Sequence, residues 1–396
     1  MFSWTNWSGT HGCNAKIIKP ENEMELISFI KKAQSENAKV HAYGSGHSWS
    51  NIMCTKNYLI NTDNFNKILS VDNIDNTVRV QAGIKLNTLN DELAKHNLML
   101  KNQAQITSQS LAGVVCTATH GSGKTGTFAS FIKEVRLLTA DGSLHNISQN
   151  ENKNFFGAAR TNLGTLGVVT EYTLECVPLF KVEQSHVKTT WDNILQCYNK
   201  VLEDNDYCEF TYNIHDDSVN LRIHNITGSE TPNSKDVDYA YKKLAWSPIW
   251  NLLPSSGTIY FDEEIAISRK NFVQAAQAFS QLLKESVTMH TKFIYVLFRF
   301  VSAENENWLS PACNEDVVYF SVTTFAEKIY EEFYRDFYNL MLKYGGRPHW
   351  GKLNYLTKKD AQKLYGQNYD NFVKVRQILD PNSMFSNDFT NKIFDN

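Results

Sequence analysis

The sequence lacks the features that mark several large classes of protein. It has no basic block, and its formal net charge is −3, which argues against nucleic acid as a partner because phosphate neutralisation needs clustered Lys and Arg. No run approaches the roughly 18 consecutive apolar residues of a membrane span. The longest apolar stretch, "FIYVLFRFV", is short and is interrupted by Arg299. We therefore expect neither nucleic-acid binding nor a membrane span.

Cysteine occurs in an odd number and in no metal-binding pattern. The seven cysteines include no C-x-x-C pair, which disfavours a disulfide framework and a zinc ribbon. Free thiols are typical of a reducing compartment. The first residues, "MFSWTNWSGTHG", also lack the positive region and apolar run of a secretory signal. These observations predict a cytoplasmic protein without a metal site.

The 396 residues suggest two or three domains with a sizeable core. Up to Pro178, short strands and helices alternate with glycine-rich turns. We expect a helix over 23–36, strands over 38–43, 58–62 and 77–84, a helix over 86–100, a hairpin over 134–148 that turns at Asp141-Gly142, and a β-rich run over 166–178.

The texture of the sequence changes after Pro178, and glycine is nearly absent over 179–251. In this second region we expect a helix over 269–286, strands over 289–304 and 317–325, and a long amphipathic helix over 326–346 that ends at Gly345-Gly346. These elements predict a separate α+β domain.

Three glycine-rich stretches could bring the backbone against a cofactor. "GSGHS" (Gly44 to Ser48) has no third glycine and precedes a poor helix, which disfavours a nicotinamide Rossmann site. "SLAGVVCTATHGSGKTG" (Ser110 to Gly126) and "NLGTLGVVTEYTL" (162–174) are equally open to two interpretations. Either two strands pack tightly there, or a cofactor runs along the backbone.

Cationic residues gather in "GGRPHWGK", where Arg347, His349 and Lys352 fall within eight residues. This stretch is either a capped helix end followed by a turn, or a cationic corner of an active site. Arg299 stands alone in an apolar strand, and a buried charge there must be paired or functional.

Taken together, these stretches resemble the covalent-flavin oxidoreductases of the vanillyl-alcohol oxidase superfamily. They are most similar to the sugar-1,4-lactone oxidase and alditol oxidase group. The resemblance covers nearly the whole chain and follows the family's order: "NWSG", "YGSGHSWS", "QSLAGVVCTATHGSG", "TADGS", "NLGTLGVVTEYTLE", "RFVSAENENWLSPA", "RPHWGK" and "LDPNSMFSN".

The resemblance implies an α+β, two-domain FAD-linked oxidase. Residues 1–178 would form a PCMH-type FAD-binding domain, 179–349 a cap or substrate domain, and 350–396 a segment that returns to the FAD-binding domain. His47 would carry FAD covalently. The neighbouring loop residues Gly44, Ser45, Gly46 and Ser48 would hold the pyrophosphate. The remaining implied FAD-binding residues are Ser110, Ala112, Gly113, Thr119, His120, Gly121, Gly164, Gly167 and Val168. The segment "LKNQAQITSQ" has no cysteine for a second link, so we expect a single histidyl bond.

The implied reaction is hydride transfer from an alcohol carbon of a sugar-derived substrate to flavin N5, with O2 as the expected acceptor and hydrogen peroxide as its product. Arg299 and Lys352 would polarise the alcohol, and Thr323 and Gln105 match family positions at the substrate. The chain departs from alditol oxidases at three positions. Leu297 stands where that group has a glutamate, Gln105 where it has a serine, and Ser321 near the place where it has a histidine. Leu297 cannot offset the charge of Arg299. We therefore expect a more cationic pocket, suited to an acid, a lactone or a sugar-like unit.

Three other interpretations stay open. A dehydrogenase of this fold would pass electrons to a quinone or a protein instead of O2. A non-catalytic relative would bind flavin or carbohydrate only. A relative acting on lipid-linked sugars would need an exposed hydrophobic face, for which no clear segment is found. The sequence does not fix the oligomeric state.

Overall fold

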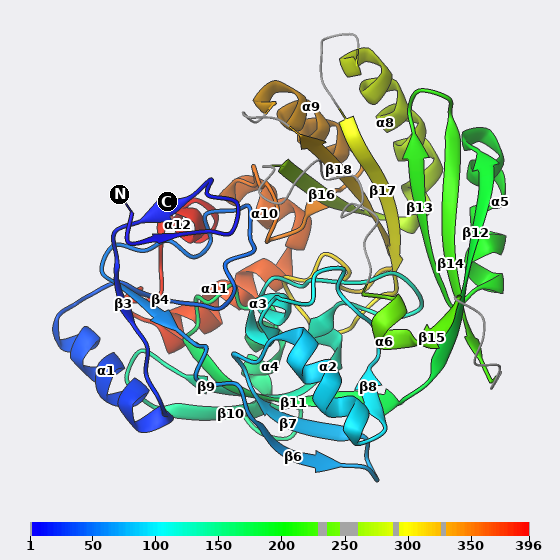
Figure 1. Ribbon diagram of the computed structural model, residues 1–396. Helices are drawn as coiled ribbons and strands as arrows, with labels where there is room; N and C mark the ends of the chain where they lie inside the picture. The colour runs from blue at the N-terminus through cyan, green and yellow to red at the C-terminus, as the bar shows by residue number, and fades with distance from the viewer. Residues whose placement is uncertain (1, 229–235, 246–259, 288–292, 326–329, 396) are drawn as a thin grey trace.

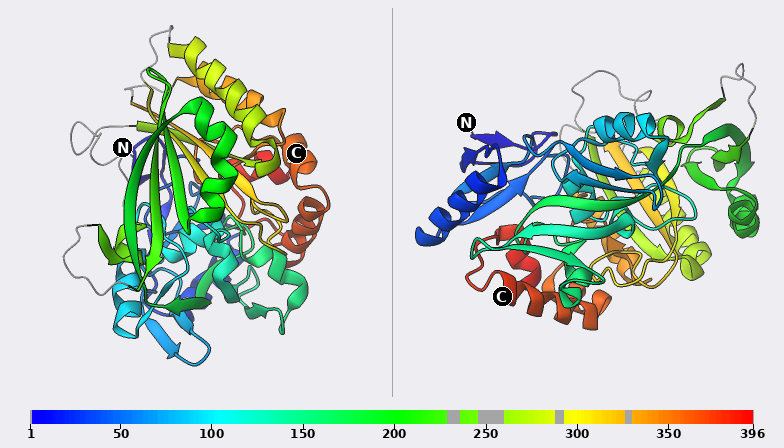
Figure 2. Two further views of the ribbon diagram at one scale, coloured as in Figure 1. Left: turned by 90° about the vertical axis from the view of Figure 1, so that its right-hand side faces the viewer. Right: turned by 90° about the horizontal axis from the view of Figure 1, so that it is seen from below.

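The computed structural model describes residues 2–228, 236–245, 260–287, 293–325 and 330–395 (Figure 1). The chain folds into two regions, each built from a mainly antiparallel sheet with helices packed on it, which confirms the expected α+β class (Figures 1 and 2). In the described part of the chain, no helix is both long and apolar enough to cross a membrane. All seven cysteines are free thiols.

A six-stranded antiparallel sheet forms the first region, in the order β10-β9-β11-β7-β6 with β8 also paired to β11. Its strands are β6 (Ile68–Asp72), β7 (Thr77–Gln81), β8 (Leu98–Leu100), β9 (Ile132–Leu138), β10 (Leu144–Ser148) and β11 (Val168–Pro178). The expected hairpin is confirmed, because Leu138 pairs with Leu144 across the Asp141-Gly142 turn. The helix expected over 86–100 is shorter. α2 (Leu86–Lys95) ends before Asn97, whose φ of +56° breaks the helix, and the chain continues as β8.

A small parallel sheet carries the loop of His47. Its strands are β3 (Lys16–Ile18), β4 (Val40–Tyr43) and β5 (Tyr58–Asn61), in the order β3-β5-β4. α1 (Glu23–Ser35) is capped by Asn22, whose side chain accepts from Glu25 N at 3.0 Å, and it buries Leu26 and Ile30 against this sheet. Between β4 and β5 the chain forms no helix, so the Gly44 to Ser48 turn opens directly from the end of a strand.

An eight-stranded antiparallel sheet forms the second region, in the order β15-β12-β14-β13-β17-β18-β16-β19. Its strands are β12 (Lys181–Thr190), β13 (Tyr207–Asn213), β14 (Ser218–Thr227), β15 (Val237–Tyr239), β16 (Tyr260–Ser268), β17 (Phe293–Val301), β18 (Val317–Phe325) and β19 (Arg347–Pro348). Helices α5 (Trp191–Asp204), α8 (Phe272–Val287) and α9 (Glu331–Leu342) pack on one face of it (Figure 1). The start of the long helix expected over 326–346 lies outside the described residues, and α9 ends earlier than expected, just before Lys343.

Side-chain alternation along β17 decides which residues face the site. Val296, Phe298 and Phe300 enter the core cluster under the helices. Leu297 and Arg299 therefore point to the opposite face of the sheet. On that side the segment after α3 (Leu111–Cys116) runs beside the end of β17, because Gly123 N donates to Phe300 O at 2.8 Å. This backbone contact brings the "THGSG" stretch next to Arg299.

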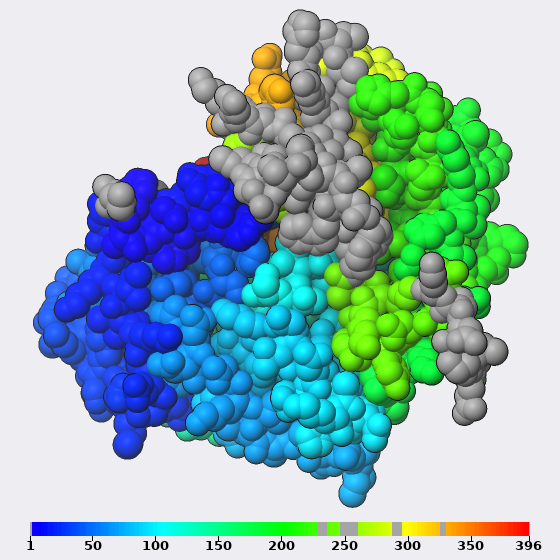
Figure 3. Space-filling model, viewed as in Figure 1, coloured from blue at the N-terminus to red at the C-terminus, as the bar shows by residue number. Residues whose placement is uncertain are grey.

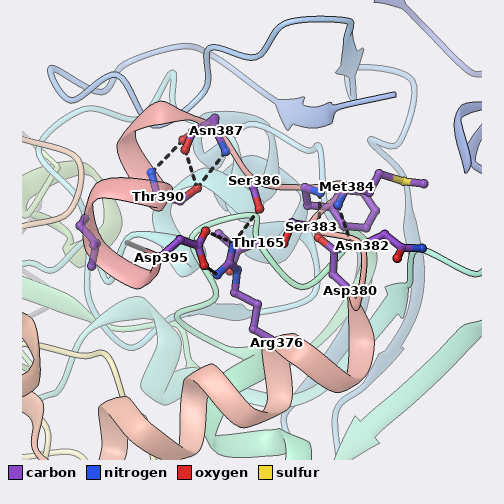
Figure 4. A network of polar contacts seen from close by, with 12 residues as sticks. Thr165, Arg376, Asp380, Asn382, Ser383, Met384, Ser386, Asn387, Thr390 and Asp395 are labelled. Atoms are coloured by element: carbon purple, nitrogen blue, oxygen red, sulfur yellow. Dashed lines mark hydrogen bonds and ion pairs between the residues drawn. The ribbon is translucent and has the colours of Figure 1, made fainter. Parts of the chain in front are cut away.

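The C-terminal helices α10 (Lys358–Tyr365), α11 (Gln367–Leu379) and α12 (Asp388–Phe394) pack in the same core as the six-stranded sheet. A polar network joins the end of α11, helix α12 and the segment between them (Figure 4). Arg376 forms an ion pair with Asp395 at 2.7 Å and donates to Ser386 Oγ at 2.6 Å. Asn387 caps α12 and also donates to Ile52 O at 2.6 Å. This last bond ties the C-terminal segment to the stretch that follows the His47 loop.

The remaining short elements are β1 (Trp4–Thr5), β2 (Gly12–Cys13), η1 (Phe128–Phe131), α4 (Lys153–Ala159), α6 (Ala240–Lys243) and η2 (Arg269–Asn271). On the face shown in Figure 3, α2 and α6 border a groove that Asn87, Asp91 and Lys242 line. Residues 105–108 line the same groove, so the two regions of the fold meet there.

Candidate active site

A cavity lies where the two regions meet. Its described lining includes fifteen of the eighteen residues expected from the sequence, drawn from both regions. These are Gly44, Ser45, Gly46, His47, Ser48, Gln105, Ser110, Ala112, Gly113, Thr119, His120, Gly164, Gly167, Arg299 and Lys352.

The His47 loop is held firmly around its imidazole. Ser45 Oγ donates to Ser108 O at 2.6 Å, and Ser108 Oγ bonds His47 Nε2 at 3.1 Å. Trp7 stacks on the ring with a centroid distance of 5.5 Å, and Trp7 N donates to Gly46 O at 2.8 Å. Nδ1 of His47 is buried and has no partner among the described residues. Burial, together with the charges of Lys85 and Lys352, lowers the pKa of His47 to about 4, so the ring is neutral at pH 7.

Small residues leave room for a ligand against the backbone. A Cβ on Gly44 would collide with the Ser110 side chain, and a Cβ on Gly164 would lie 2.7 Å from His41 Nε2. Gly46 and Gly164 also adopt φ values of +66° and +71°, which disfavour any residue with a side chain. The glycines are therefore required by geometry as well as by space. These residues and the orphaned nitrogen of His47 fit FAD lying along this wall.

Arg299 reaches the cavity as one half of a buried ion pair. Its Nη2 lies 2.5 Å from Glu264 Oε1, and Nη1 donates to His120 O at 3.4 Å. Burial alone would raise the pKa of Glu264, but Arg299 and His120 hold it well below its usual range. Tyr319 stacks on His120 at 3.5 Å and packs that ring against the site. The arginine is thus fixed by its partner and cannot move freely toward solvent.

Lys352 is held in the same way by a second acid. Its Nζ forms an ion pair with Asp262 Oδ2, and Ser321 Oγ donates to Asp262 Oδ1 at 3.0 Å. The ammonium also lies 4.8 Å from the centroid of the Trp49 ring. Backbone contacts fix the loop that carries it, since Trp49 N donates to Gly351 O at 2.8 Å. Lys352 therefore stands close to the His47 loop.

The expectation of a more cationic pocket is wrong. Each of the two cations has a buried carboxylate partner from β16, whose sequence "YFDEEIAIS" places Asp262 and Glu264 on the same face of the strand. A third acid, Glu209 of β13, pairs directly with Arg299 in the strand register. Acids inside an otherwise apolar strand were the signal that sequence reasoning missed.

Three expected residues lie outside the described lining of the cavity. Val168 is buried in the cluster beside α1, and Val169 lines the cavity in its place. Gly121 lines a smaller neighbouring cavity. Thr323 pairs with Asp262 in the sheet register and is buried on the same face of β18 as Ser321.

Arg347 takes no part in the site. Its guanidinium bonds Pro311 O at 3.1 Å and pairs with Glu315 at 3.2 Å. The "GGRPHWGK" stretch caps the end of a helix and also contributes side chains to the cavity, so it combines the two alternatives that the sequence left open. Gly346 N closes the end of α9 on Met341 O at 2.9 Å, and His349 and Lys352 then enter the cavity.

Ligand atoms of His120, Glu264 and His349 lie within 4.8 Å of one another, which is a spacing that could hold a metal ion. The geometry favours another use of these groups. Glu264 is already engaged by the guanidinium of Arg299, and Nδ1 of His349 accepts from Gly351 N at 2.9 Å. Burial lowers the pKa of His349 to about 3, so this imidazole is neutral.

Comparisons with known proteins agree with this architecture. A profile of the FAD binding domain matches residues 15–148, and one described as D-arabinono-1,4-lactone oxidase matches residues 255–393. The chain is 30% identical to an L-gulono-1,4-lactone dehydrogenase of Mycobacterium tuberculosis over 98% of both chains. It is 28% identical to an L-gulonolactone oxidase of Mus musculus, over 98% of this chain and 97% of that one.

Solved structures share the fold at low sequence identity. A cholesterol oxidase from Brevibacterium sterolicum superposes with a TM-score of 0.83 at 14% identity, covering 99% of this chain and 96% of that one. A xylooligosaccharide oxidase from Myceliophthora thermophila in complex with xylobiose gives 0.75 at 14% identity, covering 96% and 92%. The solved structures share the fold, and the family profiles and the relatives above confirm the resemblance seen in the sequence: the chain belongs to the FAD-dependent sugar-1,4-lactone oxidases and dehydrogenases of the vanillyl-alcohol oxidase superfamily.

Proposed function

We propose that this enzyme oxidises a hydroxyl-bearing carbon of an aldono-1,4-lactone. The observation that carries the proposal is the pair of cations, Arg299 and Lys352, that buried acids hold in a cavity that the His47 loop also lines. Relatives named for L-gulono-1,4-lactone and D-arabinono-1,4-lactone support the lactone as the substrate class. FAD, when bound, supplies the acceptor for the hydride.

The residues of the site have separate tasks. Lys352 and Arg299 donate hydrogen bonds to the substrate oxygen and stabilise the negative charge that develops as its proton leaves. Asp262 and Glu264 hold those two donors in place, so the donors need not reorganise during the reaction. The substrate carbon would lose a hydride to the bound flavin and its hydroxyl would lose a proton to solvent water, which leaves a carbonyl.

His47 is the proposed attachment point of the cofactor. Nε2 of the neutral ring bonds Ser108 Oγ, whereas Nδ1 is buried without a partner among the described residues, which supports Nδ1 as the linked atom. Cys116 lines the cavity, but burial raises the pKa of its thiol to about 11, so it is not a thiolate at neutral pH. We therefore propose one histidyl bond and no cysteinyl bond.

O2 is the proposed acceptor, with hydrogen peroxide as its product. A dehydrogenase using another acceptor is the second candidate, because the relative at 30% identity carries that name. An oxygen electrode run beside an artificial dye acceptor separates the two. Oxygen consumption at the rate of dye reduction supports the oxidase, and dye reduction without oxygen consumption supports the dehydrogenase.

The experiment that tests the function is anaerobic mixing of the holoenzyme with a panel of aldono-1,4-lactones, alditols and aldonic acids. Bleaching of the flavin absorbance by lactones, and a slower response to alditols, is the expected result. The proposal would be contradicted if only alditols bleached the flavin rapidly, or if no compound of the panel bleached it.

A further inference from the structure

A second, smaller cavity adjoins the flavin cavity on the side of the eight-stranded sheet. It is small, with room for about one water-sized group, and Gln105 and Arg299 line both cavities. The other walls come from β13, β14 and the segments 102–103 and 121–122. A ligand in the flavin cavity that contacts Gln105 and Arg299 therefore comes next to this smaller space.

Charged and polar side chains line this space. Glu209 and Arg222 are each 6% exposed and form an ion pair at 2.5 Å. Among the described residues, the second oxygen of Glu209 accepts one weak bond, from Gln105 Nε2 at 3.3 Å. Nε of Arg299 is buried without a partner among the described residues, and the whole residue is 7% exposed. The cavity therefore offers one carboxylate oxygen and one guanidinium N–H for a further hydrogen-bonding group.

Strand register sets this arrangement. Arg222, Glu209 and Arg299 are direct neighbours across β14, β13 and β17, so charges of alternating sign form one row. Leu297, two residues before Arg299, gives β17 no acid of its own. The acid on this side of the arginine comes from β13 instead.

We propose that this cavity is the subsite for the terminal hydroxyl group of the lactone's side chain, and that Glu209 determines specificity by accepting a hydrogen bond from that hydroxyl. A hydroxyl is both donor and acceptor, which matches a site with Glu209 on one side and Arg299 Nε on the other. The inference rests on the proposed function and adds to it the part of the substrate that is recognised. Apolar side chains of equal size would leave both groups unpaired, and the subsite rejects them for that reason.

The test compares binding of two six-carbon aldono-1,4-lactones to the holoenzyme, one with and one without the terminal hydroxyl. The flavin is first reduced chemically under nitrogen so that hydride transfer cannot occur, and titration calorimetry gives the dissociation constants. Glu209→Gln keeps the shape and removes the charge. We expect it to weaken binding of the hydroxylated lactone by about 10- to 100-fold, the range for a hydrogen bond to a charged group, and that of the deoxy lactone less than about threefold.

Two further variants keep the test decisive. Gln105→Leu removes the amide that donates to the second oxygen of Glu209 and helps to position it, and it leaves the Glu209–Arg222 pair in place. This variant should selectively weaken binding of the hydroxylated lactone, even if Glu209→Gln folds poorly. Glu203→Gln makes the same chemical change on the exposed face of α5 and should alter neither constant.

If Glu209→Gln lowered the affinity for both lactones equally, the proposed subsite would be overturned, because a purely structural ion pair would affect the binding of any ligand. Equal binding of both lactones by the wild-type enzyme would also overturn it, while leaving the proposed function intact. If the wild-type enzyme bound neither lactone, and none reduced its flavin, the proposed function would fall and the subsite with it.

Discussion

Arg299 Nη2 lies 2.5 Å from Glu264 Oε1, and both side chains are buried. Removing one partner of such a pair leaves an uncompensated buried charge, at a cost of about 3–5 kcal/mol. Glu264→Gln and Arg299→Gln should each lower the free energy of unfolding by about that amount, and the double variant by less than the sum. Urea unfolding of the four proteins measures the coupling. Strict additivity would show that the two side chains do not interact.

Lys352→Met should slow reduction of the flavin by lactone about 10²- to 10³-fold, the usual cost of removing one donor to a developing oxyanion. The flavin content should stay unchanged, because the glycine-rich wall is untouched. Stopped-flow bleaching under nitrogen measures the rate. Lys363→Met, on the exposed side of α10, is the matched control and should behave as wild type. A wild-type rate for Lys352→Met would remove this residue from the chemistry.

His47→Ala should abolish the covalent flavin link. After acid precipitation, the wild-type pellet should be yellow, whereas flavin from the variant should appear in the supernatant. Peptide mass mapping would place the adduct in the fragment that contains His47. His96→Ala, an exposed histidine at the end of α2, should keep the yellow pellet. Flavin that stays in the pellet of His47→Ala would assign the link to another residue.

Glu263 should make stability depend on pH. Both of its carboxyl oxygens are buried without a partner among the described residues, and burial, with Asp262 and Glu331, raises its pKa well above the usual range. A carboxyl whose pKa is raised on folding stabilises the fold below its unfolded pKa of about 4.3, and this contribution is lost as pH rises through the folded pKa.

Glu263→Gln should therefore gain thermal stability over wild type as pH is raised from 4.5 to 8, and little at pH 4. Glu263→Met, which also removes the unsatisfied polar atoms, should be more stable than wild type by about 1–3 kcal/mol at pH 8. Melting curves over this range measure both effects. A difference between wild type and Glu263→Gln that does not change with pH would contradict the assignment.

Leu297→Glu should shift preference toward alditols, because it restores the acid that alditol oxidases carry at this position. The new carboxylate would sit between Thr211 and Ser321 in the strand register. The ratio of kcat/KM for alditol over lactone should rise about tenfold, which corresponds to one hydrogen bond to a charged group. Leu297→Gln separates charge from size. An unchanged ranking would show that Leu297 does not set specificity.

The cofactor wall could be predicted from local sequence. Glycines are needed where the backbone adopts a positive φ, as at Gly46 and Gly164, and where a side chain would strike a neighbour, as at Gly44. Such demands fall on individual residues and their immediate neighbours. The same holds for the Asp141-Gly142 hairpin and for Arg299, whose charge inside an apolar strand marks it without any knowledge of the fold.

The charge balance of the site was decided by tertiary structure alone. Arg299 meets Glu264 across 35 positions of sequence, and Lys352 meets Asp262 across 90. These pairs depend on which strands become neighbours and in which register, because a shift of one residue turns every side chain of a strand to the other face. The sequence predicts that a cation inside an apolar strand needs a partner. Only the order and register of β13, β17, β18 and β16 select which acid provides it.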